Sequence, residues 1–331
     1  MSPWNAFCVA RTAAGRLVHR PGLALAVVAL ASVAFVSNAF FNDAASPRHH
    51  PRSDDRRPPF AQRWHALYRA PGLHALVWQP LAGFTEPAYP LTHIADGWSA
   101  FIGRRQAPNS SFDPTRMLAA RAILLSLVTA LVLAWLLGAI TVKDDSSRKA
   151  AGAAQRLRAH YLPILLVVLV PAAWQFMMGA IIFGRGPAPG VNLLRWLAHH
   201  VGRDGALSVW YASAMIPFVL LMLAPFAIVA QNTGAWRGIS QGLRLLGRNV
   251  LALIGLFVIA WGGYQALLLC DAAASLPAPL VSWFIMLSLP GLTIFWSWVH
   301  WVGMALLGLW VAYAFMEITR GPAEAPHPSE A

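Results

Sequence analysis

Residues 122–142 read AILLSLVTALVLAWLLGAITV and hold no ionisable side chain. An α-helix rises about 1.5 Å per residue, so about 20 such residues cross the roughly 30 Å of hydrocarbon in a bilayer. The stretch therefore predicts a membrane-spanning helix. Of all 331 residues, 57% are apolar and 11% are charged, which leaves more apolar surface than one water-soluble core can bury. We expect an integral membrane protein.

Five further apolar runs predict an all-α, polytopic transmembrane bundle of about six spans, with interfacial helices and an extracytoplasmic loop. The last run is too long for one straight crossing and barely long enough for two, and Pro290-Gly291 divides it. Two short crossings are the alternative; we expect one crossing, preceded by an interfacial or re-entrant piece. The six runs are residues 22–41, 122–142, 161–183, 207–230, 250–270 and 280–316.

The basic loops predict the orientation of these spans. Short loops rich in Lys and Arg stay on the cytoplasmic side of a membrane. Residues 11–20 hold three Arg and no acid, and the loops at 143–160 and 231–249 are also basic. Residues 271–279 hold no basic side chain, as an outer loop should. We therefore expect a multi-pass protein with a cytoplasmic N-terminus.

The net charge of +12 comes mainly from Arg residues that flank the apolar runs. We expect their partners to be anionic membrane lipids, and no nucleic acid. The abundance of Arg, Ala and Pro is typical of a high-GC bacterial genome, so the bacterial cell inner membrane is the expected location. Ser37-Asn38-Ala39 also fits a signal-peptidase site, which makes cleavage of residues 1–39 the alternative to a permanent first span.

The spacing of the runs divides the chain into four parts. They are a basic N-terminus with the first span at 1–41, an extracytoplasmic loop with short amphipathic helices at 42–121, five further spans at 122–318, and a disordered tail at 319–331. Within the loop, apolar residues between Pro71 and Pro80 and around Trp98 predict short pieces that lie on the membrane surface and cap the helices.

The turn after residue 231 predicts an amphipathic interfacial helix, with Asn232 or Thr233 as its N-cap. Its apolar side chains recur at helical spacing, and a basic stripe lies beside them. We expect the guanidinium groups to reach lipid phosphates, as those before the third span also do. The apolar stripe is Trp236, Ile239, Leu243 and Leu246, and the headgroup contacts are Arg237, Arg244, Arg248, Arg156 and Arg158.

The same turn carries a family resemblance. The stretch APFAIVAQNTGAW at residues 224–236, followed by Ser240 and by residues 243–249, resembles the cytoplasmic turn of a polytopic membrane domain. That domain is found beside some bacterial glycerophosphodiester phosphodiesterases and in related uncharacterised membrane proteins. The resemblance implies a multi-span helical fold. It supplies no catalytic residue, and no phosphodiesterase domain is attached to this chain.

Polar residues inside the spans are few. Ionisable groups at membrane depth usually mark function, and His300, with Gln175 and Gln265 as possible partners, forms the best candidate site. A neutral His300 bonded to a neighbouring backbone is the simpler interpretation, because no charged residue accompanies it. We expect no metal and no cofactor. His49, His50, Asp54, Asp55 and His65 match no recognised metal-ligand spacing, and adjacent His199 and His200 point in different directions.

Small residues predict close helix packing in the second span. Ser126, Ala130, Ala134 and Gly138 recur every four residues, which lets another backbone approach. We expect contact between helices of one subunit, with a dimer seam as the alternative. Because the chain lacks paired catalytic groups, we expect a non-catalytic accessory or scaffold subunit of a membrane complex, in contact with other membrane proteins. A small-solute or lipid transporter is the alternative.

Reporter fusions test this topology. For fusions after residues 150 and 240, we expect GFP fluorescence and no alkaline phosphatase activity, because both sites lie in basic loops that stay inside. A fusion after residue 275 serves as the control and should show the reverse. Phosphatase activity at either of the first two sites would contradict the assignment.

Overall fold

The computed structural model describes residues 3–45, 79–89, 91–92, 114–141, 149–183, 189–274 and 289–320. This described part is helical and contains no strand, which confirms the predicted all-α bundle. Its helices are α1 (Pro3–Val18), α2 (Pro21–Ala45), α4 (Gln79–Thr85), α6 (Pro114–Thr141), α7 (Lys149–Phe183), α8 (Pro189–Leu221), α9 (Ala224–Gln231), α10 (Ala235–Arg248), α11 (Val250–Ala274) and α13 (Leu289–Arg320).

The described helices make a multi-pass membrane protein. Five of them are long and apolar enough to cross a bilayer, and the bent pair α1 and α2 adds a sixth if it counts as one span. The five spans are Ala122–Thr141, Leu157–Met178, Tyr211–Gln231, Val250–Leu268 and Trp298–Arg320. Four of them begin and end within five residues of an apolar run, because the length of the run sets the length of the crossing. The fifth begins at Trp298, well inside the last run, and ends four residues beyond it.

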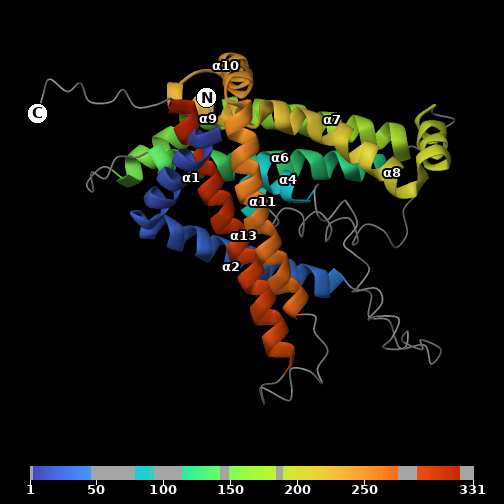
Figure 1. Ribbon diagram of the computed structural model, residues 1–331, viewed down its shortest axis with the longest axis horizontal. Coiled ribbons are helices and arrows are strands. Elements are labelled where there is room, and N and C mark those ends of the chain that lie inside the picture. Colours follow the sequence, from blue (N-terminus) through green and yellow to red (C-terminus); the bar gives the residue numbers. More distant parts are fainter. Residues whose placement is uncertain are drawn as a thin grey trace, which may run out of the picture.

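The helices form two groups (Figure 1). In one group α6, α7 and α8 lie side by side, and in the other α11 and α13 form a pair that packs against α1 and α2. Helix α9 joins the groups, since it contacts α6, α7 and α13. Helix α10, the N-terminus and the C-terminal end of α13 lie at the same end of the bundle, which we call the basic end.

Tryptophan indoles tie neighbouring helices together by hydrogen bonds. The Nε1 of Trp298 donates to the Ser32 hydroxyl at 2.9 Å, and the Nε1 of Trp310 donates to the Ala10 carbonyl at 3.1 Å. Trp298 thereby links α13 to α2, and Trp310 links α13 to α1. In a bilayer such bonds contribute on the order of 1 kcal/mol each.

Charged residues fix the corner between α1 and α2, where the chain bends by 85°. Arg20 donates to the carbonyls of Ala139 and Ile140 at 3.2 and 3.1 Å, at the C-terminal end of α6. Those carbonyls have no partner inside their own helix, and the helix dipole favours a cation there. Arg16 of α1 forms an ion pair with Glu317 of α13. The corner therefore contacts two spans.

The fourth apolar run is interrupted where one span was predicted. Helix α8 ends at Leu221 and α9 begins at Ala224, with Pro225 in its first turn. Proline has no N–H, and its ring clashes with the preceding turn of a helix, so the break falls just before it. A second departure from helical geometry lies at Gly202, whose φ of 75° suits glycine.

The last apolar run contains one spanning helix in its described part. Helix α13 continues without a break from Leu289, and Pro290 stands in its first turn, where a missing N–H costs nothing. Pro290-Gly291 therefore stands in the first turn of this helix, and whether it divides the run depends on the residues before Leu289. Residues 280–288 lie outside the described residues. The helix continues through Arg320, two residues into the predicted tail, and residues 321–331 also lie outside them.

Helix α4 corrects a prediction about the loop at residues 42–121. Its apolar residues were expected on the membrane surface, but Phe84 is only 3% exposed, and Ala88 and Leu91 beyond it are also buried. Gly83 packs against the ring of Tyr264 in α11. Helix α4 and the residues after it are buried because their apolar side chains pack between neighbouring helices. The predicted surface piece around Trp98 lies outside the described residues.

Aromatic rings join α4 to three other helices. Phe84 meets Phe257 of α11 edge to face at 5.4 Å between ring centroids, and it meets Phe315 of α13 at 5.0 Å. Phe315 in turn meets Phe226 of α9 at 5.2 Å. Each such pair contributes about 0.5–1.5 kcal/mol beyond the area it buries. The rings therefore hold α4 against α11 and α13 and link it, through Phe315, to α9.

Replacing Gly308 by Ala tests the packing of α13 against the residues that follow α4. A Cβ at this position would collide with the Pro87 carbonyl oxygen, and backbone atoms cannot move aside as a flexible side chain can. We expect a loss of about 1–3 kcal/mol, seen as a lower melting temperature in detergent. Gly262→Ala is the matched control, because nothing lies within 4 Å of its Cβ position. Equal melting temperatures for the two variants would contradict the contact.

Candidate functional site

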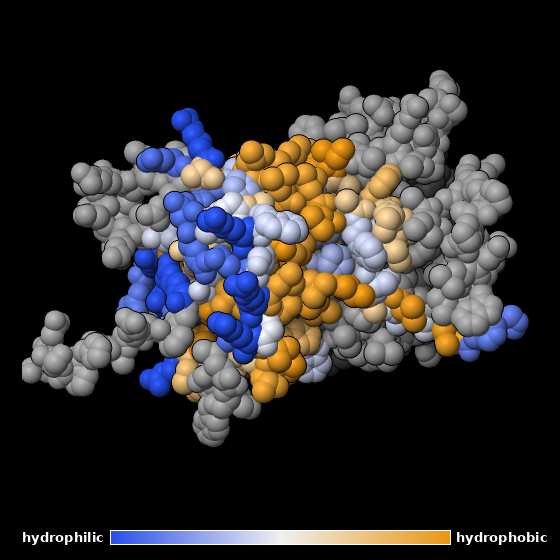
Figure 2. Space-filling model, turned by 90° about the horizontal axis from the view of Figure 1, so that it is seen from above, coloured by the Kyte–Doolittle hydropathy of each residue, from blue (hydrophilic) through white to orange (hydrophobic). Residues whose placement is uncertain are grey.

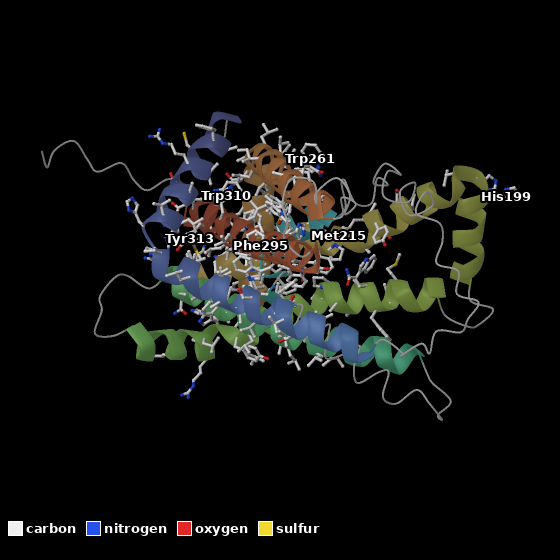
Figure 3. The ribbon with its side chains drawn as sticks, turned by 90° about the horizontal axis from the view of Figure 1, so that it is seen from below. His199, Met215, Trp261, Phe295, Trp310 and Tyr313 are labelled. Carbon is white, nitrogen blue, oxygen red and sulfur yellow. The ribbon has the colours of Figure 1, made fainter. Side chains whose placement is uncertain are left out.

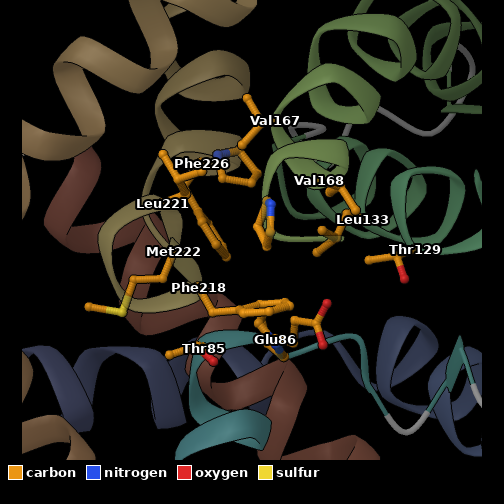
Figure 4. Close-up of a pocket in the computed structure, with 13 residues that line it drawn as sticks. Thr85, Glu86, Thr129, Leu133, Val167, Val168, Phe218, Leu221, Met222 and Phe226 are labelled. Atoms are coloured by element: carbon orange, nitrogen blue, oxygen red, sulfur yellow. The ribbon is translucent and has the colours of Figure 1, made fainter. Parts of the chain in front are cut away.

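A groove lies at the junction of α8 and α9 (Figure 4). It is a small cavity of about 40 Å³ that is partly open to the outside. We call it the α6–α9 groove, and these helices and the residues at the end of α4 form its walls. Its lining residues are Thr85, Glu86, Pro87, Thr129, Leu133, Val167, Val168, Pro171, Phe218, Leu221, Met222, Pro225 and Phe226.

The local sequence explains why a groove forms here. Pro171 of α7 and Pro225 of α9 both line it, and neither has an N–H. In a regular helix those N–H groups would bond to the carbonyls of Val167 and Leu221, which belong to lining residues as well. Two helices therefore depart from regular bonding at the same place. Irregular backbone at membrane depth is tolerated only where protein or a cavity surrounds it.

The groove lies near the middle of the membrane. Leu133, Val167 and Leu221 line it, and each stands close to the centre of its spanning segment. Most of the lining is aliphatic or aromatic, as in sites that hold apolar molecules. The groove therefore faces the depth at which acyl chains, and not water, surround the protein.

Three polar residues face this apolar lining. Thr85 donates its hydroxyl to the carbonyls of Leu81 and Ala82 at 3.0 and 3.2 Å, so its donor is already used. Thr129 is 5% exposed on α6. Among the lining residues that the structure describes, Glu86 alone carries a charge. Figure 4 shows its carboxylate beside the ring of Phe218, directed into the groove.

Glu86 is the charged lining residue that sequence reasoning missed. An ionisable group at membrane depth is costly, and it usually marks a binding site or an ion path. The prediction assigned residues 42–121 to an outer loop, where an acidic residue is unremarkable. The available signal was a short apolar segment, Leu81–Ala88, with one acid between Thr85 and Pro87.

The structure separates the three residues of the predicted polar site. The Nδ1 of His300 lies 3.0 Å from the Leu267 carbonyl of α11. A carbonyl only accepts, so Nδ1 carries the proton in this bond. Gln265 is half-buried on α11, in the same helix pair as His300, whereas Gln175 is exposed on α7 in the other group. This arrangement agrees with a histidine bonded to a neighbouring backbone.

The small-residue stripe of α6 lies inside the bundle. Ser126, Ala130 and Ala134 are at most 2% exposed, and Gly138 is also buried. Ser126 donates its hydroxyl to the carbonyl of Ala122 at 2.7 Å, within its own helix. Helix α6 packs along α7. The stripe is thus covered by helices of the same chain.

Helix α10 has three distinct faces. Gly238 and Gly242 pack directly on α9; a Cβ at Gly242 would lie 2.8 Å from the Ala224 nitrogen. Beside this glycine face, Trp236 is 82% exposed and Leu243 is 41% exposed. A third face carries exposed Arg237, Arg244 and Arg248. An apolar face and a basic face side by side are what a helix in the headgroup layer needs.

The start of α10 differs from the prediction. Gly234, and neither Asn232 nor Thr233, is the N-cap, and no side chain caps the helix. Asn232 ends α9 instead, in the left-handed conformation with φ and ψ both 50°, and its N–H bonds to the Ile228 carbonyl. Asparagine tolerates this conformation better than most residues. The α9–α10 turn is therefore built by a C-cap.

The hydrophilic surface gathers at the basic end, and a band of hydrophobic surface lies beside it (Figure 2). Arg158 is exposed on α7, while the side chain of Arg156 lies outside the described residues. Figure 3 places His199 far from Trp310 and Tyr313, which lie near α1. The exposed rings of His199 and His200 are 5.6 Å apart between centroids.

The five loop residues that match no metal-ligand spacing, His49, His50, Asp54, Asp55 and His65, lie outside the described residues. Within the described ranges, no group of three or more His, Cys, Asp or Glu side chains is placed to hold a metal ion. No family model, curated protein or solved structure matched this chain.

Replacing Arg237, Arg244 and Arg248 together by Gln tests the basic face of α10. Each guanidinium near an anionic surface contributes about 1 kcal/mol, so we expect the variant to retain much less anionic lipid after purification. Native mass spectrometry gives the amount retained. The Lys triple variant keeps the charge and should retain lipid as the parent does. Unchanged retention by the Gln variant would contradict this role.

Proposed function

We propose that the protein works without catalysis, as an accessory or scaffold subunit of a membrane complex, and that the α6–α9 groove holds an apolar molecule from the bilayer. The apolar lining of the groove at membrane depth carries this proposal. Acid–base or nucleophilic chemistry needs two or more cooperating groups, and the described lining offers Glu86 and two hydroxyls. Holding a molecule needs only a fitting surface.

Binding in such a groove follows membrane physics. Lipid tails are as apolar as a leucine side chain, so an apolar ligand gains no hydrophobic free energy when it leaves them. Its affinity arises from van der Waals contact with a preformed wall. Phe218 and Phe226 offer broad ring surfaces, while Leu133 and Val168 narrow the opposite side (Figure 4). Shape therefore selects the occupant.

The surroundings of the groove support the proposed location. The basic end carries the exposed Arg residues of α10, which suit the anionic cytoplasmic face of a bacterial inner membrane. The N-terminus lies at the same end (Figure 1), in line with a cytoplasmic N-terminus. The likeness of residues 224–249 to a phosphodiesterase-associated membrane domain points to a similar role beside other membrane proteins.

A lipid or small-solute transporter is the second candidate, and one observation favours it. The α8–α9 span is interrupted at the groove, and the residues after α4 reach the same place. Interrupted helices at membrane mid-depth commonly form transport sites. A scaffold that only holds a lipid does not need an interrupted helix.

Filling the groove tests its use. We expect Val168→Trp, which adds a bulky ring to the lining, to reduce labelling of residues 218–226 by a photoactivatable fatty acid about tenfold, equal to about 1.4 kcal/mol of binding. Leu166→Trp is the control, because Leu166 is 51% exposed on the same helix. Equal labelling of the two variants would contradict the groove as a binding site.

Reconstitution separates the two candidate functions. Flux of the bound molecule across proteoliposomes, lost in Val168→Trp and kept in Leu166→Trp, would identify a transporter. Binding without flux, together with membrane proteins that co-purify in mild detergent, is the outcome expected of an accessory subunit. A lone monomer would contradict the accessory role.

A further inference from the structure

We propose that the junction of α10 and α11 binds one anionic phospholipid from the leaflet at the basic end. Its phosphate lies between Arg244 and Arg248, and an acyl chain runs along the exposed face of α11. The site is separate from the α6–α9 groove and does not depend on the proposed function. It goes beyond a general attraction of α10 for headgroups, because it assigns one lipid molecule to two of the three Arg residues.

The charge at this junction is positive and has no compensating acid in the sequence around it. Arg244 and Arg248 stand one turn apart on α10, where Cβ atoms are about 5–6 Å from each other. Both are exposed, and within the described part of the chain neither forms a hydrogen bond or an ion pair. Residues 232–258 contain no acidic side chain. Like charges at this spacing repel, so an anion between them lowers the free energy of both.

A phosphate is the anion that suits this pair. Guanidinium groups bind phosphate oxygens through paired N–H donors, and the one-turn spacing directs both groups to the same side of α10. Arg237 stands two turns before Arg244, about 10 Å along the helix axis, so it does not share this phosphate. A zwitterionic headgroup brings its own ammonium group, which the pair repels. A headgroup with net negative charge is therefore selected.

An apolar surface for the acyl chain begins directly after the pair. The crossing made by α11 begins at Val250, two residues after Arg248. Three residues of chain span at most about 11 Å, so Arg248 lies close to Leu251. Leu251, Ile254 and Val258 are each more than half exposed, and their spacing of three and four residues places them on one face of α11. A lipid held by its phosphate at Arg248 thus contacts this face through an acyl chain.

The corner between the two helices is fixed by hydrogen bonds. Asn249 alone separates α10 from α11, and its side-chain amide donates to the Leu245 carbonyl at 2.9 Å. Its backbone N–H bonds to the carbonyls of Leu245 and Leu246. Figure 1 shows α10 lying across the end of the bundle where α11 begins. The phosphate part and the acyl part of the site are therefore held in place before a lipid arrives, which lowers the cost of binding.

Native mass spectrometry of the full chain in uncharged detergent tests the inference. The probes are phosphatidylglycerol and phosphatidylcholine with identical acyl chains. We expect the parent protein to bind its first phosphatidylglycerol about tenfold more tightly, which corresponds to about 1.4 kcal/mol. Arg244→Gln and Arg248→Gln should each remove most of this preference. Arg237→Gln is the matched control, because it removes the same charge from the same helix and should leave the preference unchanged.

A phosphatidylglycerol with a photoactivatable group in its acyl chain tests the path along α11. We expect crosslinks on residues 250–258 in the parent protein and severalfold fewer in Arg248→Gln. The exposed side chains of Leu162, Leu166 and Val170 on α7 serve as the internal control. Their labelling should be the same in both proteins, since ordinary bilayer lipid covers them.

Each contrary outcome is distinct. A parent protein that binds the two lipids equally overturns the inference, even if an Arg variant fails to fold. Equal losses in all three single variants also overturn it, because they indicate attraction by the whole basic face. Crosslinks on α11 that persist in Arg248→Gln contradict the acyl path. The α6–α9 groove is tested separately, by Val168→Trp.

Discussion

The packing of Phe84 against the rings of Phe257 in α11 and Phe315 in α13 is the contact on which the arrangement of the bundle depends. Lipid tails compete with helices for apolar surface, so helices in a bilayer associate through close fit and not through exclusion from water. The short helix α4 supplies that fit. Just beyond it, Pro87 lies against Gly308, where no side chain intervenes.

The packing of α4 also positions the candidate site. Thr85, Glu86 and Pro87 follow directly from Phe84, so the burial of one ring brings a carboxylate to the α6–α9 groove. The opposite wall depends on the junction of α8 and α9, where Phe218 and Phe226 lie on either side of the two-residue turn at Met222 and Leu223. Packing of α4 and interruption of a span thus combine to form one groove.

The spanning helices could be predicted from the sequence because hydrophobic length decides membrane insertion almost residue by residue. The amphipathic character of α10 was equally clear, since Trp236 and Arg237 mark different faces at helical spacing. The glycine face of α10 could not be predicted, because Gly238 and Gly242 carry no hydropathy signal. Their role in packing becomes visible only in the structure, where Ala224 lies against Gly242. Asn232 illustrates the same limit: a polar residue between two helices can end the first or begin the second.

The candidate site could not be predicted because it depends on tertiary placement. Helix α4 is short, and nothing in its composition distinguishes a buried helix from one that lies on the membrane surface. The sequence pattern therefore did not single out Glu86. It did single out His300, because this residue is an isolated ionisable group in an apolar run. The structure gives His300 an ordinary backbone partner in Leu267. Burial, which sequence pattern alone does not supply, reverses the importance of these two residues.

The contacts of α1 impose an order on biosynthesis. Arg20 binds carbonyls of α6, Ala6 packs on Gly255 of α11, and Arg16 pairs with Glu317 near the end of α13. The segment that leaves the ribosome first therefore gains its docking partners one after another, α6 before α11 and α11 before α13. The ion pair between Arg16 and Glu317 can form only after the final span has been made, so it is the last of these contacts to close.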